Sequence, residues 1–226
     1  MKRGAEKSSG DTAALNIRRA GPDGFLLDCA NGDGNSQTIR NIIGTRRLRR
    51  WRVPLGFIAA GLLVAFSHPT WQLMSIGAPI ALCGLAIRAW AAGHLRKKVE
   101  LATSGPYAHT RNPLYLGSCL MAAGCGVSAG NWWLALALLG GMAVVYVPVM
   151  RAEVNETRRL FADDYPRYAE AVPLFVPRMT PYRGLAQRSF DWRLYLARRE
   201  YQALIGLAVV MGILALKAAK ILRFGF

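Results

Sequence analysis

Cysteine and acidic side chains are both scarce in this chain of 226 residues, and each shortage narrows the classes of protein to consider. The four cysteines follow no CxxC or Cys/His spacing, and two of them, Cys119 and Cys125, lie inside one apolar run. We therefore expect neither a disulfide framework nor a metal site, and we interpret these cysteines as small buried hydrophobic residues.

Only 13 residues are Asp or Glu, against 29 Lys and Arg, which gives a formal net charge of +16. Such an excess suits either nucleic acid or the anionic inner surface of a membrane. Because 53% of the residues are hydrophobic and they gather into long runs, the membrane is favoured. We expect contacts with anionic lipids of the inner leaflet and no nucleic-acid partner.

Five apolar runs predict an all-α fold, a polytopic membrane helix bundle of about five transmembrane helices. The first run is short for a span, which needs about 20 residues. Residues 1–45 are rich in small and polar residues and are expected to form a disordered basic tail, so the membrane domain is placed at residues 46–226. The runs cover residues 53–66, 71–93, 114–130, 131–150 and 202–216.

The distribution of arginine and lysine predicts how these helices are oriented. The links at residues 67–70 and 128–131 contain neither residue, whereas ten arginines lie between Arg151 and Arg199. By the positive-inside rule the N-terminus and the polar segments are cytoplasmic, at the inner membrane if the protein is bacterial. The last run ends in Lys217 and Lys220, so it is either a fifth span or a helix lying partly in the interface.

Residues 104–117 carry the most informative motif. Gly105 and Pro106 predict a turn, and Pro113 suits the first turn of a helix. Free amides at that helix start, with Arg111 beside them, favour binding of a carboxylate or phosphate at the membrane surface. The alternative is an ordinary interfacial loop whose tyrosines belong to the aromatic belt.

A second motif follows the fourth run. Glu153 and Glu156 are three residues apart and share one helical face. Carboxylates at that depth need partners, and we considered Arg88, Arg111 or a bound cationic ligand. Arg88 is otherwise expected to snorkel toward the membrane surface.

The string GPYAHTRNPLYLG, followed by FADDYPRYAEAVP, resembles the isoprenylcysteine carboxyl methyltransferase and phospholipid methyltransferase family. The resemblance covers residues 87–177 and implies a cytoplasmic pocket for S-adenosylmethionine at the span ends. It implies catalytic roles for Arg111, Asn112 and Glu153. The implied cofactor-binding residues are His94, Gly105, Pro106, Tyr107, Arg111, Asn112, Pro113, Tyr115, Glu153 and Glu156.

The resemblance predicts an integral membrane methyltransferase dependent on S-adenosylmethionine, acting on a lipophilic or lipid-modified acceptor such as a carboxylate. Eukaryotic members of the family commonly have His where this chain has Asn112, and a second acidic residue often stands where this chain has Val154. Asn cannot titrate near neutral pH, so an acceptor that needs a base would depend on another group, such as His94. Two alternatives stay open: a membrane reductase using NADPH, and a non-catalytic lipid-binding protein of the same fold.

Overall fold

The computed structural model describes residue 54 and residues 56–96, 99–184 and 188–220. Within these ranges all regular structure is helical, which confirms the predicted fold class. The predicted tail, residues 1–45, lies outside the described residues. The helices are Gly56–Ala65, α2 (Trp71–Ala92), η1 (Gly105–Ala108), α3 (Pro113–Ala129), α4 (Trp132–Leu160), α5 (Tyr165–Ala171), α6 (Trp192–Ala197) and α7 (Tyr201–Ala218).

Local sequence signals set the helix boundaries. The Thr70 hydroxyl accepts a hydrogen bond from the Leu73 amide at 3.3 Å and caps α2, and Asn131 caps α4 in the same way. Pro113 opens α3, where its missing N–H costs nothing. Gly130 ends α3 with φ +70°, a left-handed conformation suited to glycine, so α3 and α4 form a tight antiparallel hairpin.

Three of the helices, α2, α4 and α7, are long and apolar enough to cross a membrane. The other two apolar helices, Gly56–Ala65 and α3, are shorter. Helix α4 has 29 residues and continues past the end of its apolar run at Met150 to Leu160. The protein is therefore an integral membrane protein whose fourth apolar helix extends beyond the hydrocarbon region.

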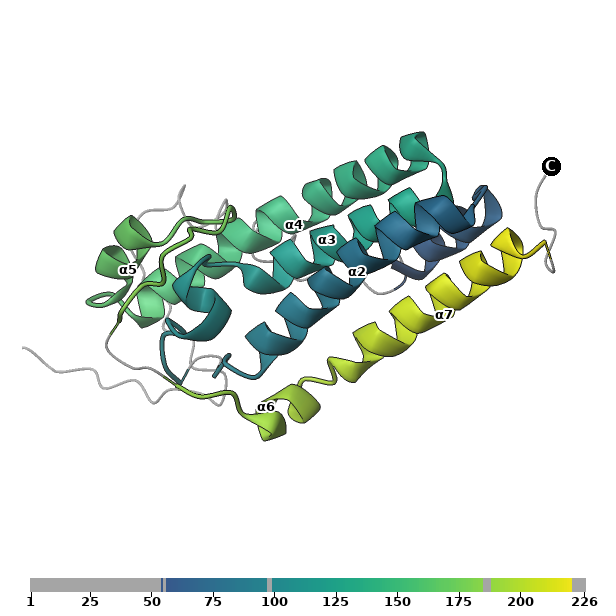
Figure 1. Cartoon of the computed structure of the whole chain (residues 1–226). Coiled ribbons are helices and arrows are strands. Elements are labelled where there is room, and N and C mark those ends of the chain that lie inside the picture. The colour runs from purple at the N-terminus through teal and green to yellow at the C-terminus, as the bar shows by residue number, and fades with distance from the viewer. Residues whose placement is uncertain (1–53, 55, 97–98, 185–187, 221–226) are drawn as a thin grey trace, which may run out of the picture. The chain divides into compact units, whose positions relative to one another are not determined.

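Helices α2 and α3 lie side by side, with α4 against α3 and α7 against both α2 and α3 (Figure 1). The close approach of α2 and α3 depends on facing glycines. A Cβ atom built on Gly84 would lie 2.5 Å from the carbonyl oxygen of Gly117, and one on Gly124 would lie 2.5 Å from that of Gly77. Small residues of this kind let membrane helices pack backbone to backbone.

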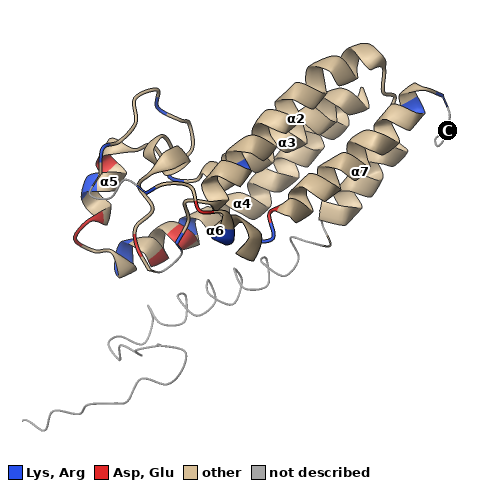
Figure 2. Ribbon diagram, turned by 60° about the horizontal axis from the view of Figure 1, so that its bottom comes forward, with Lys and Arg blue, Asp and Glu red and all other residues tan. Residues whose placement is uncertain are grey.

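Charged residues gather at the end of the bundle that carries α5 and α6, while the long helices are largely free of them (Figure 2). This end holds the segments before α3, after α4 and before α7. The concentration of charge agrees with a polar surface outside the bilayer. Which side of the membrane it faces remains a prediction from the positive-inside rule.

The C-terminal end of α7 lies at the end of the bundle opposite the charged end (Figure 1). The Lys217 ammonium donates a hydrogen bond to the carbonyl oxygen of Val64 at 2.8 Å, at the end of helix Gly56–Ala65. Because α7 also packs along α2 and α3, it follows the bundle instead of lying across its end. This arrangement favours the fifth span over the interfacial alternative.

Candidate active site

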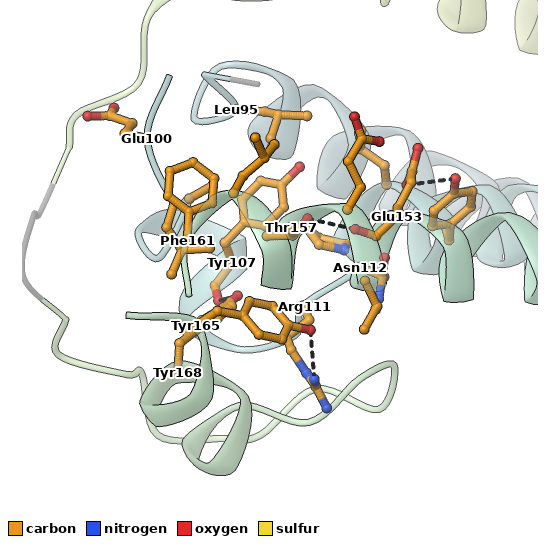
Figure 3. Close-up of a pocket in the computed structure, with 18 of the residues that line it drawn as sticks. Leu95, Glu100, Tyr107, Arg111, Asn112, Glu153, Thr157, Phe161, Tyr165 and Tyr168 are labelled. Atoms are coloured by element: carbon orange, nitrogen blue, oxygen red, sulfur yellow. Dashed lines mark hydrogen bonds between the residues drawn. The ribbon is translucent and has the colours of Figure 1, made fainter. Parts of the chain in front are cut away.

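A cavity of about 280 Å³ lies at the charged end of the bundle (Figure 3). Its walls come from the C-terminal end of α2, the start of α3, the C-terminal half of α4, α5 and the segment before α7. Both aromatic and charged side chains line it. The polar and aromatic lining residues are Arg88, Glu100, Tyr107, Arg111, Asn112, Tyr115, Glu153, Glu156, Thr157, Phe161, Tyr165, Tyr168, Arg198 and Glu200.

The turn before α3 forms one wall. Gly105 has φ +59°, a left-handed conformation that a residue with a Cβ adopts only at a cost. A Cβ there would also lie 2.8 Å from the ring of His94. The turn continues into η1, which places Tyr107 in the cavity wall, where it is almost fully buried.

The segment after α5 is fixed over the loop that precedes α3. The Arg111 amide donates to the Pro173 carbonyl at 3.0 Å, and the Arg178 amide donates to the His109 carbonyl at 2.9 Å. The Asn112 side-chain amide donates to the Leu174 carbonyl at 3.0 Å. The two motifs recognised in the sequence are therefore joined by hydrogen bonds in the structure.

Arg111 reaches from the start of α3 to α5. Its Nη1 atom donates a hydrogen bond to the Tyr165 hydroxyl at 3.1 Å. Its Nε atom is buried and has no hydrogen-bond partner among the described residues. A buried guanidinium N–H without a partner is costly, so this atom is suited to an anionic ligand group in the cavity.

Glu153, on α4, faces the first turn of α3. The Tyr115 hydroxyl donates to the Glu153 carboxylate at 3.0 Å, and the Tyr115 ring packs against Tyr146 with centroids 4.8 Å apart. Val149, one turn earlier on α4, is fully buried in the same cluster. The carboxylate is thus held at the cavity by packing between α3 and α4.

Burial raises the pKa of Tyr107 and of Tyr168 well above the usual value of a phenol. The Tyr168 hydroxyl donates to the Tyr107 carbonyl at 2.8 Å. Both phenols consequently stay protonated at neutral pH. Tyr168 serves as a hydrogen-bond donor, and neither protonated phenol is suited to act as a base.

Seven of the ten residues predicted for the site line this cavity, and the other three, His94, Gly105 and Pro106, do not. The His94 Nδ1 atom lies 2.9 Å from the Trp90 carbonyl, and its ring packs under Gly105. The seven lining residues are Tyr107, Arg111, Asn112, Pro113, Tyr115, Glu153 and Glu156.

Sequence reasoning missed Arg198 and Glu200 and misjudged Arg88. Arg88 does not snorkel: its Nη2 atom forms an ion pair with the Glu200 carboxylate at 2.7 Å, and it also donates to Ser118 on α3. The pair joins residues 112 positions apart in the chain. The adjacent charges of Arg198, Arg199 and Glu200, just before an apolar run, were the only available signal.

The sequence model of the phospholipid methyltransferase family matches residues 58–164. A curated relative from Cupriavidus metallidurans (strain ATCC 43123 / DSM 2839 / NBRC 102507 / CH34), the cobalt-zinc-cadmium resistance protein CzcN, is 32% identical over 163 residues, covering 67% of this chain and 73% of the relative. The chain belongs to the phospholipid methyltransferase family. Its resemblance to isoprenylcysteine carboxyl and phospholipid methyltransferases is thereby confirmed.

A second member of the same group of relatives is the nickel-cobalt-cadmium resistance protein NccN of Alcaligenes xylosoxydans xylosoxydans. It is 31% identical over 145 residues, covering 61% of this chain and 68% of the relative. No solved structure matches the chain. Membership of the phospholipid methyltransferase family makes this protein a membrane methyltransferase, and the matched region includes Arg111 and Glu153.

Proposed function

We propose that the protein transfers a methyl group from S-adenosylmethionine to a lipophilic acceptor at the cytoplasmic surface of the membrane. The observation that carries this proposal is the cavity that brings Arg111 and Tyr115 of the first motif together with Glu153 of the second. It lies where the apolar helices meet the charged end of the bundle. A soluble cofactor and a membrane-held acceptor are thus able to reach the same site.

The charges around the cavity suit this cofactor. Four glutamates and three arginines line it, a formal net charge of one negative unit. S-adenosylmethionine carries an ammonium, a sulfonium and one carboxylate, so its net charge is opposite. The buried Arg111 Nε is a donor for the carboxylate, and Glu153 and Glu156 are acceptors for the ammonium.

Aromatic rings complete the fit. Tyr107, Tyr115, Phe161 and Tyr165 all line the cavity. Aromatic faces attract cations by about 0.5–2 kcal/mol, with the larger values at sites shielded from water. These rings offer a surface for a sulfonium without placing a second charge beside it.

The protein's own part in the reaction is binding and alignment. S-adenosylmethionine, when bound, supplies a methyl group activated by a good leaving group. Arg111 and Glu153 hold opposite groups of the cofactor, and the segment after α5 excludes water above it. Asn112 holds that segment in place through its bond to Leu174 while lining the cavity.

An acceptor that is already ionised fits this site best. Asn112 stands where eukaryotic members of the family commonly have a titratable histidine, and it cannot act as a base. His94, the alternative base, packs under Gly105 and not on the cavity surface. A carboxylate needs no proton removal before it attacks, so we propose a carboxylate on a lipid or another lipophilic molecule as the acceptor.

Calorimetry with S-adenosylhomocysteine on the purified protein tests the cofactor assignment. Arg111→Ala and Glu153→Gln should each weaken binding about tenfold or more, because hydrogen bonds to charged groups contribute about 1.5–3 kcal/mol. Arg158→Ala and Glu170→Gln are matched controls, since both residues are exposed outside the cavity. They should bind as the wild type does.

Tritiated methyl transfer into a membrane lipid extract tests the reaction itself. Base-labile label in the lipid fraction would identify a methyl ester and hence a carboxylate acceptor. Binding of NADPH in place of S-adenosylhomocysteine would instead support the reductase. Binding of neither at millimolar concentration would support the non-catalytic lipid-binding protein.

A further inference from the structure

The cavity has two sides, built from different parts of the chain. Arg111 and Tyr165 lie on one side, next to α5, and Leu95 lies on the opposite side with Tyr107 between them (Figure 3). Arg198 and Glu200 belong with Leu95, because the Arg198 guanidinium donates to the Leu95 carbonyl. Arg198 and Glu200 lie outside the region that matches the phospholipid methyltransferase family, which ends at residue 164, whereas Leu95 lies inside it.

Residues 188–200, which we call the C-terminal arm, are fixed to the inner end of α2. The Asp191 amide donates to the Gly93 carbonyl at 3.0 Å, and the Arg198 Nη2 donates to the Leu95 carbonyl at 2.7 Å. The Phe190 ring packs on Gly93 and His94. The arm therefore closes the cavity on this side and leads directly into α7.

Arg88 is the charged residue that α2 contributes to this side of the cavity. Its side chain is 18% exposed and that of Glu200 is 12% exposed, so their ion pair is largely removed from water. One Nη atom bonds to Glu200 and the other to Ser118 and the Leu114 carbonyl. The Nε atom is buried and has no hydrogen-bond partner among the described residues.

These contacts fix the plane of the guanidinium. A guanidinium is a rigid fork of donors, so holding both Nη atoms also determines where the Nε–H points. Breaking a buried ion pair by removing one member leaves an uncompensated charge and is costly. Glu200 thus controls the orientation of a donor that belongs to the cavity wall.

We propose that Glu200 is a positioning residue for Arg88, and that Arg88 contacts the anionic oxygen of the methyl acceptor on this side of the cavity. The inference rests on the proposed function, which assigns Arg111 and Glu153 to the cofactor. The nucleophilic oxygen then approaches from the side of the arm. The cavity accordingly has a cofactor side, formed by the two family motifs, and an acceptor side, formed by α2 and the C-terminal arm.

The test uses the full-length protein with Glu200→Gln, Glu200→Ala and Arg88→Lys, and Glu170→Gln as the matched control. Methyl transfer is followed at graded concentrations of membrane lipid extract, and affinity for S-adenosylhomocysteine is measured by calorimetry. In Glu200→Ala the half-saturating extract concentration should rise about tenfold or more. Glu200→Gln keeps a hydrogen-bond acceptor and should show a smaller rise.

Arg88→Lys separates positioning from a merely structural role. Lysine keeps the charge and the pairing with Glu200, so thermal stability should stay near that of the wild type, but it lacks the Nε–H and the planar fork. The half-saturating extract concentration should therefore rise while S-adenosylhomocysteine affinity stays within about twofold.

Two results would overturn the inference alone: wild-type use of the extract by Arg88→Lys, or a loss of S-adenosylhomocysteine affinity in Glu200→Ala as large as its loss of acceptor use. A wild-type protein that binds no S-adenosylhomocysteine would overturn the proposed function and this inference with it.

Discussion

Replacing Gly105 with alanine tests whether the turn that carries Tyr107 into the cavity wall requires a residue without a side chain. Two costs add at this position. The left-handed backbone, φ +59°, costs an L-residue about 1–2 kcal/mol. The new Cβ would lie 2.8 Å from the His94 ring, well inside the ordinary separation of about 3.5–4.0 Å, and such overpacking costs about 1–3 kcal/mol.

The two costs are separable with a second variant. Removing the ring in His94→Ala should abolish the steric cost of Gly105→Ala and leave the backbone cost, so the alanine at residue 105 should destabilise this background less. Thermal unfolding in detergent gives the stabilities, and calorimetry with S-adenosylhomocysteine gives the effect on the site. Gly212→Ala, where a Cβ meets no atom within 4 Å, is the control.

Equal destabilisation by Gly105→Ala in the wild-type and His94→Ala backgrounds would refute the contact between the turn and the ring. No destabilisation in either background would refute the strained turn as well.

Two further predictions concern helix packing and the buried phenols. Gly84→Leu should destabilise the protein by about 1–3 kcal/mol or more, because its Cβ would lie 2.5 Å from the Gly117 carbonyl oxygen. Gly140→Leu is the control: a Cβ there meets no atom within 4 Å, so the melting temperature should stay nearly unchanged. Similar losses of stability in both variants would contradict the packing of α2 on α3. The raised pKa of Tyr168 stabilises the folded state below the unfolded pKa of about 10, and this contribution is lost as pH rises, since the unfolded chain deprotonates first. Tyr168→Phe should therefore reduce the fall in melting temperature between about pH 8 and pH 11, and an unchanged fall would exclude this phenol as its source.

The parts of the fold that follow local rules were predictable from the sequence. Helix α3 begins at Pro113 and ends before Gly130, as the backbone preferences of these two residues predict. The bounds of α2, α3 and α7 agree with those of the predicted apolar runs to within a few residues. The apolar run of α4 ends at Met150, but the helix continues to Leu160, as the shared helical face of Glu153 and Glu156 predicted. The residues after Met150 are polar but have good helix propensity, so the hydrophobic run predicted the extent of the membrane span and not the extent of the helix.

The candidate site was predictable where its residues lie close in sequence or share a known motif. Arg111, Tyr115 and Glu153 were expected together, and the structure places them around one cavity. The pairing of Arg88 with Glu200 was not predictable, because it joins two ends of the chain through tertiary packing and follows no spacing rule. Each charge taken alone had an ordinary explanation at the end of an apolar run.

The direct backbone contact between α2 and α3 has a consequence for the geometry of the cavity. With only hydrogen atoms between the helices at Gly84 and Gly117, neither helix is free to slide or rotate against the other. Arg88, one turn beyond Gly84, and Pro113, at the start of α3, therefore keep a constant separation at the cavity. A Cβ built on glycines of α4 and α7, such as Gly140, would meet no other atom within 4 Å. The pair α2–α3 therefore serves as the fixed frame of the cavity, and α4 and α7 pack on this frame less closely.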